Sequence, residues 1–409
     1  MIEVSLLILF IMVVANYNLS KDYLYPPFIY SVVWFCVILF YMIILQFHII
    51  EINTVSALSL LIFIGGVFSF SLGGFTIFAI KNKLSINRTL PDQKIIVNKL
   101  LDNIFFILPI IFLPLYILEA IKISHYTGID NFFIGLRWGL NYDNQSYGYL
   151  QYFVTFSIFN CIYRILIISK FKEFHATYKY KAYISLCIAL IYIIFSTGRT
   201  GILFVLISLI GVAAVNRSLS IKKIIFSVAM FLIAFFLYAV ILKKGGSEAQ
   251  SFYINLVSVN NIILEYIFGS LPAFDSFIHT SYDLLYGENT FRILYLVLSK
   301  LSFFDGSATQ LVQPFVEVPF STNVYTIYKH YILDFDILGS FIVIYIIGSF
   351  HTYLYSNIYK DLRSKMLFIL FLYPLIFSFF QDQFFSLSST WIQYYILTIF
   401  TFKYIIKGS

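Results

Sequence analysis

Long apolar segments alternate with short polar connections along nearly the whole chain. A run such as SVVWFCVILFYMIIL has no regular alternation of apolar and polar residues, which argues against the strands of a membrane barrel. Many runs reach the roughly 20 residues that an α-helix needs to cross a bilayer. The pattern predicts an all-α polytopic membrane protein with about 11 (10–12) transmembrane helices. The expected spans are approximately 4–19, 28–47, 54–80, 102–120, 149–169, 182–197, 200–215, 224–242, 341–357, 366–381 and 388–402.

Basic residues concentrate in three connections between the expected spans, at 81–99, 169–181 and 216–223. Cytoplasmic loops of membrane proteins carry an excess of Lys and Arg. Placing these connections inside is consistent along the chain, and it puts most of the 27 basic residues in the cytoplasm. The first expected span is short and leaves the N-terminus outside. An even number of spans with both ends inside is the alternative.

Composition supports the same class of protein. Hydrophobic residues make up 60% of the chain and charged residues 11%, whereas soluble domains carry roughly 25% charged residues. The net charge of +7 reflects the topology signals, so we expect no binding of nucleic acid. The three cysteines lie in apolar runs without the spacing of a metal site, and we expect neither a metal nor another cofactor.

Two long segments fall outside the membrane in this topology. They cover about 122–148 and 243–340. Loops longer than roughly 15 residues are usually functional or disordered, and the second segment is too apolar for disorder. Its parts NIILEYIFGSLPAFDSFI and FRILYLVLSKLSFF are expected to form amphipathic helices at the membrane surface or over a cavity. We find no soluble domain and no internal repeat, and we predict one integral membrane domain over 1–409.

Arg199 lies between two apolar runs, in the stretch FSTGRTGILF. An arginine within the membrane costs about 2.5–3.5 kcal/mol on insertion scales. The glycines favour a tight turn between two spans, and amides at the start of a helix attract anions. The guanidinium adds a fork suited to phosphate. Two interpretations stay open: an arginine that reaches the membrane interface with no ligand, or one that binds a phosphate group.

Two further arginines lie in the expected external segments. Arg137 occurs in GLRWGLNYDNQSYGY, among aromatic and amide side chains that suit a sugar. The alternative is an aromatic belt at the membrane interface. Arg292 opens an expected amphipathic helix after GENTF, and its alternative is a solvated charge. We interpret both as candidate ligands for an anionic substrate.

A third polar cluster lies in FSTNVYTIYKHYILDFDILGS, at 320–340. If this stretch is helical, Thr322, Asn323, Thr326, Lys329 and His330 share one face. His330 is the candidate general base, with a purely structural histidine as the alternative. The candidate catalytic residues are His330, Lys329 and Asp334, and Asn323 and Tyr325 are candidate substrate ligands.

Known motifs of soluble enzymes are missing from the sequence. It contains no P-loop, no HExxH, no GxSxG and no Cys–His metal pattern. Acidic residues at the middle of expected spans are scarce, which weakens an ion-coupled transporter. The remaining candidates are therefore the arginines and the 320–340 cluster.

Three features of the chain together resemble the Wzy-type O-antigen (oligosaccharide repeat unit) polymerases. They are STGRT after an apolar span, a large late external loop, and STNVYTIYKHYILDFDILGS before the next span. The resemblance covers the whole chain as a pattern, and its specific parts are those two motifs with Arg137 and Arg292. O-antigen ligases are related and carry a His-Asn-x-Tyr-like element in the late loop. Asn323 and Tyr325 match that element, but Thr322 stands at the histidine position, which favours the polymerases.

The resemblance implies a glycosyltransferase of lipopolysaccharide and polysaccharide biosynthesis in the bacterial inner membrane, with its active site facing the periplasm. It implies as substrate a glycan repeat unit on undecaprenyl pyrophosphate and as possible partner a chain-length regulator. Arg137, Arg199 and Arg292 would bind the pyrophosphate without a metal. The alternatives are a transporter or flippase of lipid-linked oligosaccharide, and an O-antigen ligase. Sugar identity, stereochemistry and oligomeric state have no signature in the sequence.

Overall fold

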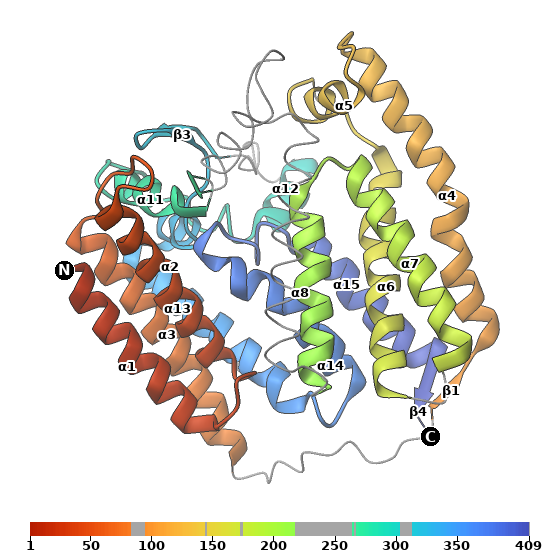
Figure 1. Cartoon of the computed structure of the whole chain (residues 1–409), viewed down its shortest axis with the longest axis horizontal. Coiled ribbons are helices and arrows are strands. Elements are labelled where there is room, and N and C mark those ends of the chain that lie inside the picture. The colour runs from red at the N-terminus through yellow and green to blue at the C-terminus, as the bar shows by residue number, and fades with distance from the viewer. Residues whose placement is uncertain are drawn as a thin grey trace. The chain divides into compact units, whose positions relative to one another are not determined.

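The chain folds almost entirely into α-helices in the computed structural model (Figure 1). The structure describes residues 1–82, 95–143, 145–171, 175–216, 264–265, 267–302 and 313–408. Eight helices in these ranges are long and apolar enough to cross a membrane. They cover Ile2–Ser20, Pro26–Phe47, Ala57–Lys81, Lys99–Tyr126, Gly148–Lys170, Tyr178–Phe195, Tyr328–Asn357 and Leu362–Phe379. The expected all-α polytopic membrane protein is therefore confirmed.

The remaining expected spans have different outcomes. The expected span 200–215 forms a helix that is shorter than the eight, Arg199–Val215, and the last expected span forms Ser388–Phe400. The expected span 224–242 lies outside the described residues. The helix expected at 341–357 begins at Tyr328 instead, so the late polar motif belongs partly to a long helix.

Contacts divide the chain into two compact units. The first comprises Met1–Arg88, Ser251–Tyr359 and Phe371–Ser389, and the second Thr89–Gln250, Lys360–Leu370 and Thr390–Ser409. Each unit therefore combines segments that are distant in the sequence. The prediction of one integral membrane domain is not tested by this division.

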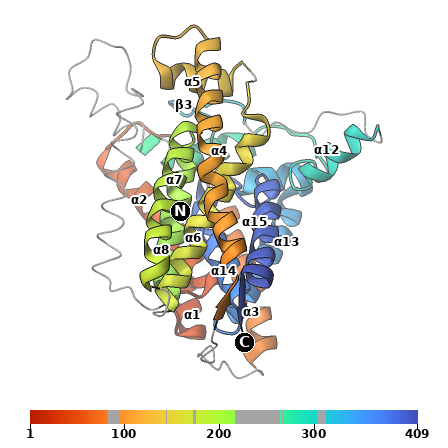
Figure 2. The same ribbon diagram turned by 90° about the vertical axis from the view of Figure 1, so that its right-hand side faces the viewer.

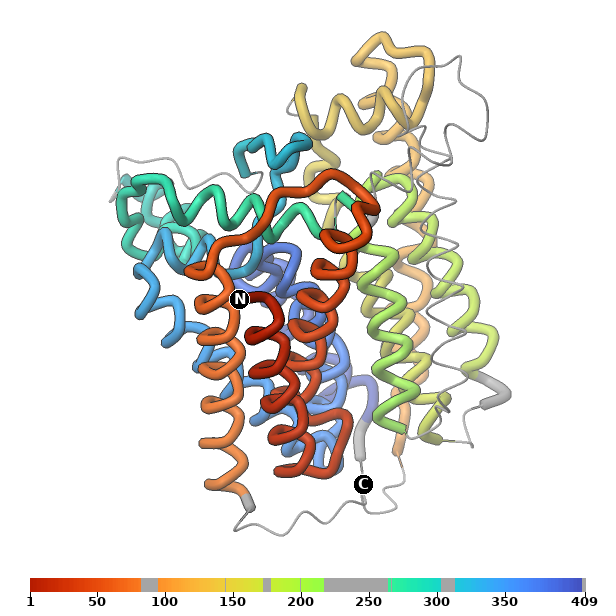
Figure 3. Tube along the Cα trace, turned by 60° about the vertical axis from the view of Figure 1, so that its left-hand side comes forward, coloured from red at the N-terminus to blue at the C-terminus, as the bar shows by residue number. Residues whose placement is uncertain are grey.

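The first unit is built on α1 (Ile2–Ser20), α2 (Pro26–Phe47), α3 (Ala57–Asn82) and α13 (Tyr328–Asn357), which pack against one another (Figures 1 and 3). Apolar side chains such as Leu7 and Ile11 lie 60% and 57% exposed on α1. A helix with apolar residues all around it is stable in lipid. The unit also contains α11 (Ser270–Ile278), α12 (Arg292–Lys300), the paired strands β2 (Val316–Glu317) and β3 (Ser321–Thr322), and η3 (Phe377–Phe379).

The second unit contains α4 (Lys99–Tyr126), α6 (Tyr152–Lys170), α7 (His175–Phe195) and α8 (Arg199–Val215), of which α6 contacts both α7 and α8 (Figure 2). The short helix α5 (Phe132–Asn141) lies in the expected external segment 122–148, and η1 (Gly148–Gln151) begins at its last residue. Strand β1 (Ile95–Val97) pairs antiparallel with β4 (Ile406–Gly408), which follows η4 (Thr401–Ile405). Helices α14 (Leu362–Ile376) and α15 (Ser388–Phe400) contribute residues to both units.

Glycines bring α3 and α13 into backbone contact. A Cβ atom at Gly73 would lie 2.1 Å from the carbonyl oxygen of Tyr345, and one at Gly348 would lie 2.3 Å from that of Phe70. Small residues permit this approach between membrane helices, whose association depends on close packing. The position of α13, and of the polar cluster at its start, therefore depends on these two glycines.

Substitution of Gly73 by valine is expected to destabilise the protein by about 2 kcal/mol, because the new side chain meets backbone that cannot move aside. The measurement is the thermal unfolding midpoint in detergent. Leu72→Val is the control, since Leu72 lies on the same helix and is 46% exposed. An unchanged midpoint for Gly73→Val would contradict the close contact.

Candidate functional site

The start of α13 carries a polar cluster in the first unit, which we call the α13 cluster: Asn323, Tyr325, Lys329, His330 and Asp334. The expected continuous helix over 322–330 is wrong. Ser321–Thr322 form a strand, and α13 begins at Tyr328. Within this set, Lys329 contacts Tyr325, whereas Asp334 bonds to the loop before α12. Asn323 is half-buried.

Lys329 is buried, with 5% of its surface exposed. Its Nζ lies 3.2 Å from the centroid of the Tyr325 ring and 5.5 Å from that of Phe277. Among the residues that the structure describes, no carboxylate forms an ion pair with it. An aromatic face stabilises a cation by roughly 0.5–2 kcal/mol, whereas removing an ion from water costs several kcal/mol. The ammonium group is thus only partly compensated.

Tyr325 holds the loop before β2 against this lysine. Its hydroxyl donates to the carbonyl oxygen of Pro314 at 3.0 Å. Burial raises the pKa of Tyr325 above its usual range, so the hydroxyl stays a neutral donor. The Tyr325 side chain is therefore held by two contacts: its ring face lies against the Lys329 ammonium group, and its hydroxyl bonds to the loop at Pro314.

His330 is also buried, and its two ring nitrogens differ. Nε2 lies 2.9 Å from the side-chain Nε2 of Gln313, while Nδ1 has no hydrogen-bond partner within the described ranges. The partner of one ring nitrogen determines which nitrogen carries the proton. With the amide of Gln313 donating to Nε2, a neutral ring carries its proton on Nδ1 and can donate there. Gln313 was not expected from the sequence, because it lies in no motif.

Asp334 accepts four hydrogen bonds from two residues of the loop before α12. Its Oδ1 accepts from the backbone and side-chain nitrogens of Asn289 at 3.2 and 2.9 Å. Its Oδ2 accepts from the backbone nitrogen and Oγ1 of Thr290 at 2.7 and 2.6 Å. These contacts occupy the carboxylate and tie α13 to the segment that leads to Arg292.

Arg292 is the first residue of α12 and is partly buried. Burial lowers the pKa of its guanidinium from the usual value, which indicates partial removal from water. Arg292 and the α13 cluster belong to the same unit.

Arg137 and Arg199 belong to the second unit, where packing joins the segments that carry them. Helix α7 ends at Phe195 and α8 begins at Arg199, so the expected tight turn is confirmed. The rings of Phe132 and Phe133, on the helix of Arg137, lie 5.9 and 6.1 Å from that of Phe195. The helix of Arg137 therefore packs against the turn before Arg199.

The turn itself differs from the expectation in one detail. The positive φ, +56°, lies at Thr197, whereas Gly198 has an ordinary φ of −86°. Gly201 packs closely instead, because a Cβ there would lie 3.0 Å from the side chain of Ile193. Within the described residues, no side chain of the N-cap position caps the start of α8, because Gly198 occupies it.

The aromatic residues around Arg137 divide into two groups. Trp138 and Tyr142 are 48% and 60% exposed, with ring centroids 4.6 Å apart, and Tyr149 is 89% exposed. Tyr147 is buried instead. Its ring stacks on Tyr116 at 4.1 Å, and its hydroxyl donates to the carbonyl oxygen of Phe195. The expectation of a sugar-facing ring is thus wrong for Tyr147, which fixes the external segment to the Arg199 turn.

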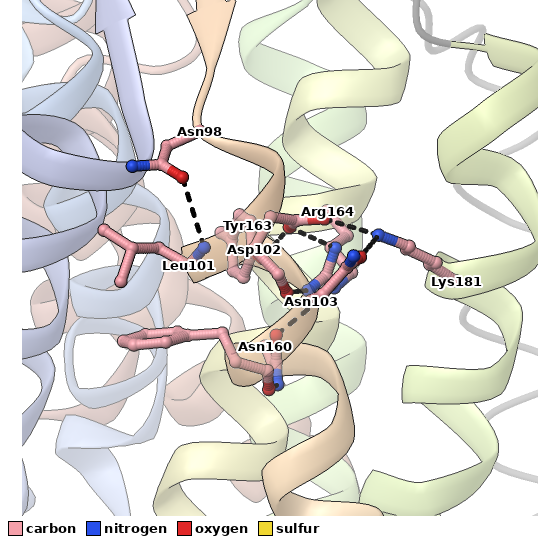
Figure 4. A network of polar contacts seen from close by, with 9 residues as sticks. Asn98, Leu101, Asp102, Asn103, Asn160, Tyr163, Arg164 and Lys181 are labelled. Atoms are coloured by element: carbon pink, nitrogen blue, oxygen red, sulfur yellow. Dashed lines mark hydrogen bonds and ion pairs between the residues drawn. The ribbon is translucent and has the colours of Figure 1, made fainter.

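The second unit contains a buried ionic network that was not expected from the sequence (Figure 4). Asp102 Oδ1 accepts from Arg164 Nη1 at 2.6 Å and from the hydroxyl of Tyr163 at 2.9 Å, and Oδ2 pairs with Lys181 at 2.6 Å. Arg164 also donates to the side chain of Asn160. The signal was available, because Arg164 lies inside the apolar run YFVTFSIFNCIYRILIIS. Since its donors have partners here, we interpret the network as structural.

Within the described ranges, no group of three or more His, Cys, Asp or Glu side chains could hold a metal ion. The expectation of a metal-independent protein stays a prediction. The candidate cations of the sequence are divided between the units: Lys329 and Arg292 belong to the first, and Arg137 and Arg199 to the second.

No protein-family model and no solved structure matches the chain. Over 216 residues it is 26% identical to a protein of Escherichia coli (strain K12) described as a "Putative O-antigen polymerase". The aligned part covers 53% of this chain and 51% of that protein, so the chain spans about half the length of this curated relative. The description of the relative agrees with the family that the motifs resemble.

Proposed function

We propose that this protein is an O-antigen or polysaccharide repeat-unit polymerase. It would transfer a growing glycan from undecaprenyl pyrophosphate to the non-reducing end of a lipid-linked repeat unit, at the periplasmic face of the inner membrane. The observation that carries the proposal is Lys329, a buried cation over an aromatic ring without a carboxylate partner in the described part of the chain. The likeness to the E. coli protein supports the same activity.

In this reaction the bond between the anomeric carbon and the pyrophosphate oxygen breaks. A new bond forms between that carbon and an acceptor hydroxyl oxygen, whose proton leaves. Negative charge accumulates on the departing undecaprenyl pyrophosphate, and fixed cations stabilise charge that develops in a water-poor site. Lys329 and Arg292 of the first unit would supply this charge. Arg137 and Arg199, in the second unit, stay candidate ligands of an anionic substrate.

The acceptor side of the reaction needs positioning and proton transfer. His330 would contact the acceptor hydroxyl or the leaving group through Nδ1, which has no hydrogen-bond partner among the described residues. Asn323 would bind a sugar hydroxyl. The chemistry needs no metal ion in this proposal, since the positive charge comes from side chains.

Reconstitution tests the proposal directly. Proteoliposomes with the purified protein receive an undecaprenyl-pyrophosphate-linked repeat unit, and the glycans are sized on a gel. A ladder of repeat lengths is the expected result, and Arg199→Ala is expected to reduce it strongly. Translocation of the unit without extension would indicate the flippase, and transfer only to lipid A core would indicate the ligase. Either result would overturn the polymerase.

A further inference from the structure

The loop before α12 is joined to the first turns of α13 by several contacts besides those of Asp334. The backbone nitrogen of Leu285 donates to the carbonyl oxygen of Leu333 at 2.8 Å. The hydroxyl of Tyr282 donates to Asp336 at 3.2 Å, and Asp336, with a non-helical φ of 61°, is the residue at which α13 kinks. The loop is therefore held against the same stretch of α13 that carries the α13 cluster.

Asp334 is the strongest of these connections. It is 1% exposed, and its partners Asn289 and Thr290 are 6% and 4% exposed. Hydrogen bonds to an ionised acceptor are roughly twice as strong as neutral ones. Two donors bind each carboxylate oxygen, so the group has little capacity left to exchange a proton with a substrate. This geometry suits a residue that positions another.

The residue so positioned is Arg292, which follows Thr290 by two places. Between them, the backbone nitrogen of Phe291 donates to the carbonyl oxygen of Gly287 at 2.7 Å. Gly287 has a φ of +94°, and a Cβ there would lie 2.8 Å from the ring of Phe291. Three features thus determine where α12 begins and where its first residue, Arg292, lies. They are the positive φ of Gly287, the turn closed by Phe291, and the hydrogen bonds of the Asp334 carboxylate.

We propose that Asp334 is a positioning residue, which places Arg292 for contact with the pyrophosphate of the lipid-linked substrate. This inference rests on the proposed function. Asp334 would act through Arg292 alone, so its removal would matter only while the arginine is present. Residues that act as a unit show non-additive effects on rate.

A double-mutant cycle in proteoliposomes tests this dependence. We expect Arg292→Ala to lower the rate of chain extension about 100-fold and Asp334→Asn to lower it to a similar extent, with a higher KM for the lipid-linked donor in both. Adding Asp334→Asn to Arg292→Ala is expected to cause less than a twofold further loss. Multiplication of the two losses in the double variant would overturn the inference.

Asp275→Asn is the matched control. Asp275 accepts from the backbone nitrogen and hydroxyl of Ser56 and from the hydroxyl of Ser59, and so ties α11 to the start of α3. It is a similar carboxylate connection in the same unit, and its hydrogen-bond partners in the described part of the chain, Ser56, Ser59 and His279, do not belong to α12. Any loss of extension rate that Asp275→Asn causes is expected to be independent of Arg292, so that in the double variant the two fold-losses multiply.

Two further measurements separate the possible failures. If Arg292→Ala keeps the full rate of chain extension, the proposed role of Arg292 is wrong, whatever the effect of Asp334→Asn. If Asp334→Asn does not fold, Thr290→Val removes one of the four donors and keeps the shape of the side chain. Its loss is expected to vanish in the Arg292→Ala background, and persistence of the loss would contradict the inference.

Discussion

Replacement of Lys329 by methionine is expected to lower the rate of glycan extension by about 100-fold or more. The change removes a buried charge and keeps most of the length of the side chain. If the cation serves only the departing pyrophosphate, its loss leaves the folded protein no less stable, because an ion without a carboxylate partner costs free energy in the interior. The thermal unfolding midpoint of Lys329→Met is thus expected to stay the same or rise while the activity falls.

This opposite movement of stability and activity distinguishes a functional lysine from a structural one. Lys329→Arg keeps the charge with a larger, planar group and is expected to keep part of the rate. Lys122→Met is the control, because Lys122 is exposed and pairs with Glu119 at 2.9 Å on the surface. A folded Lys329→Met variant that builds ladders at the normal rate would remove Lys329 from the site.

Replacement of Arg164 by methionine is expected to have the opposite profile, a large loss of stability. The change leaves Asp102 buried with Lys181 as its remaining cation and removes the donors to Asn160 and to the backbone oxygen of Asp102. Breaking a buried ion pair on one side costs about 3–5 kcal/mol. The midpoint of thermal unfolding and the yield of monodisperse protein in detergent measure the effect.

A second substitution checks the cause of that loss. Asp102→Asn in the Arg164→Met background removes the carboxylate whose partner was lost, so we expect the double variant to lose less than the sum of the single losses. Arg363→Met, at an exposed position near the start of α14, controls for loss of an arginine as such. Strict additivity of Asp102→Asn and Arg164→Met would contradict a direct contact.

Lys329 and Arg164 also show how far the role of a charged residue can be predicted from its place in an apolar run. Arg164 and Lys329 are both buried cations, but Arg164 has an acidic partner 62 residues earlier in the chain, and Lys329 has an aromatic ring four residues away. Sequence spacing singled out the second and missed the first. Pairing across helices has no local pattern, because it depends on which spans become neighbours.

Hydrophobic length by itself determined the fold class, because lipid requires each spanning segment to satisfy its own backbone hydrogen bonds. It located most of the helices and the tight turn at Arg199. The motif 320–340 was likewise visible as a polar stretch at the entrance of a span. These features depend on residues that are close in the chain, and such residues act within one helix or one turn.

Only the tertiary structure decided what the polar side chains contact. It placed Lys329 over the ring of Tyr325, without an ion pair to any carboxylate in the described part of the chain, and it placed Gln313 against His330. It also assigned Tyr147 to the core and Asp334 to the loop before Arg292. Each outcome results from packing between distant segments, including the glycine contacts of α3 with α13. Local sequence carries no record of those contacts, since a polar residue looks the same whether its partner is water, a neighbouring helix or a substrate.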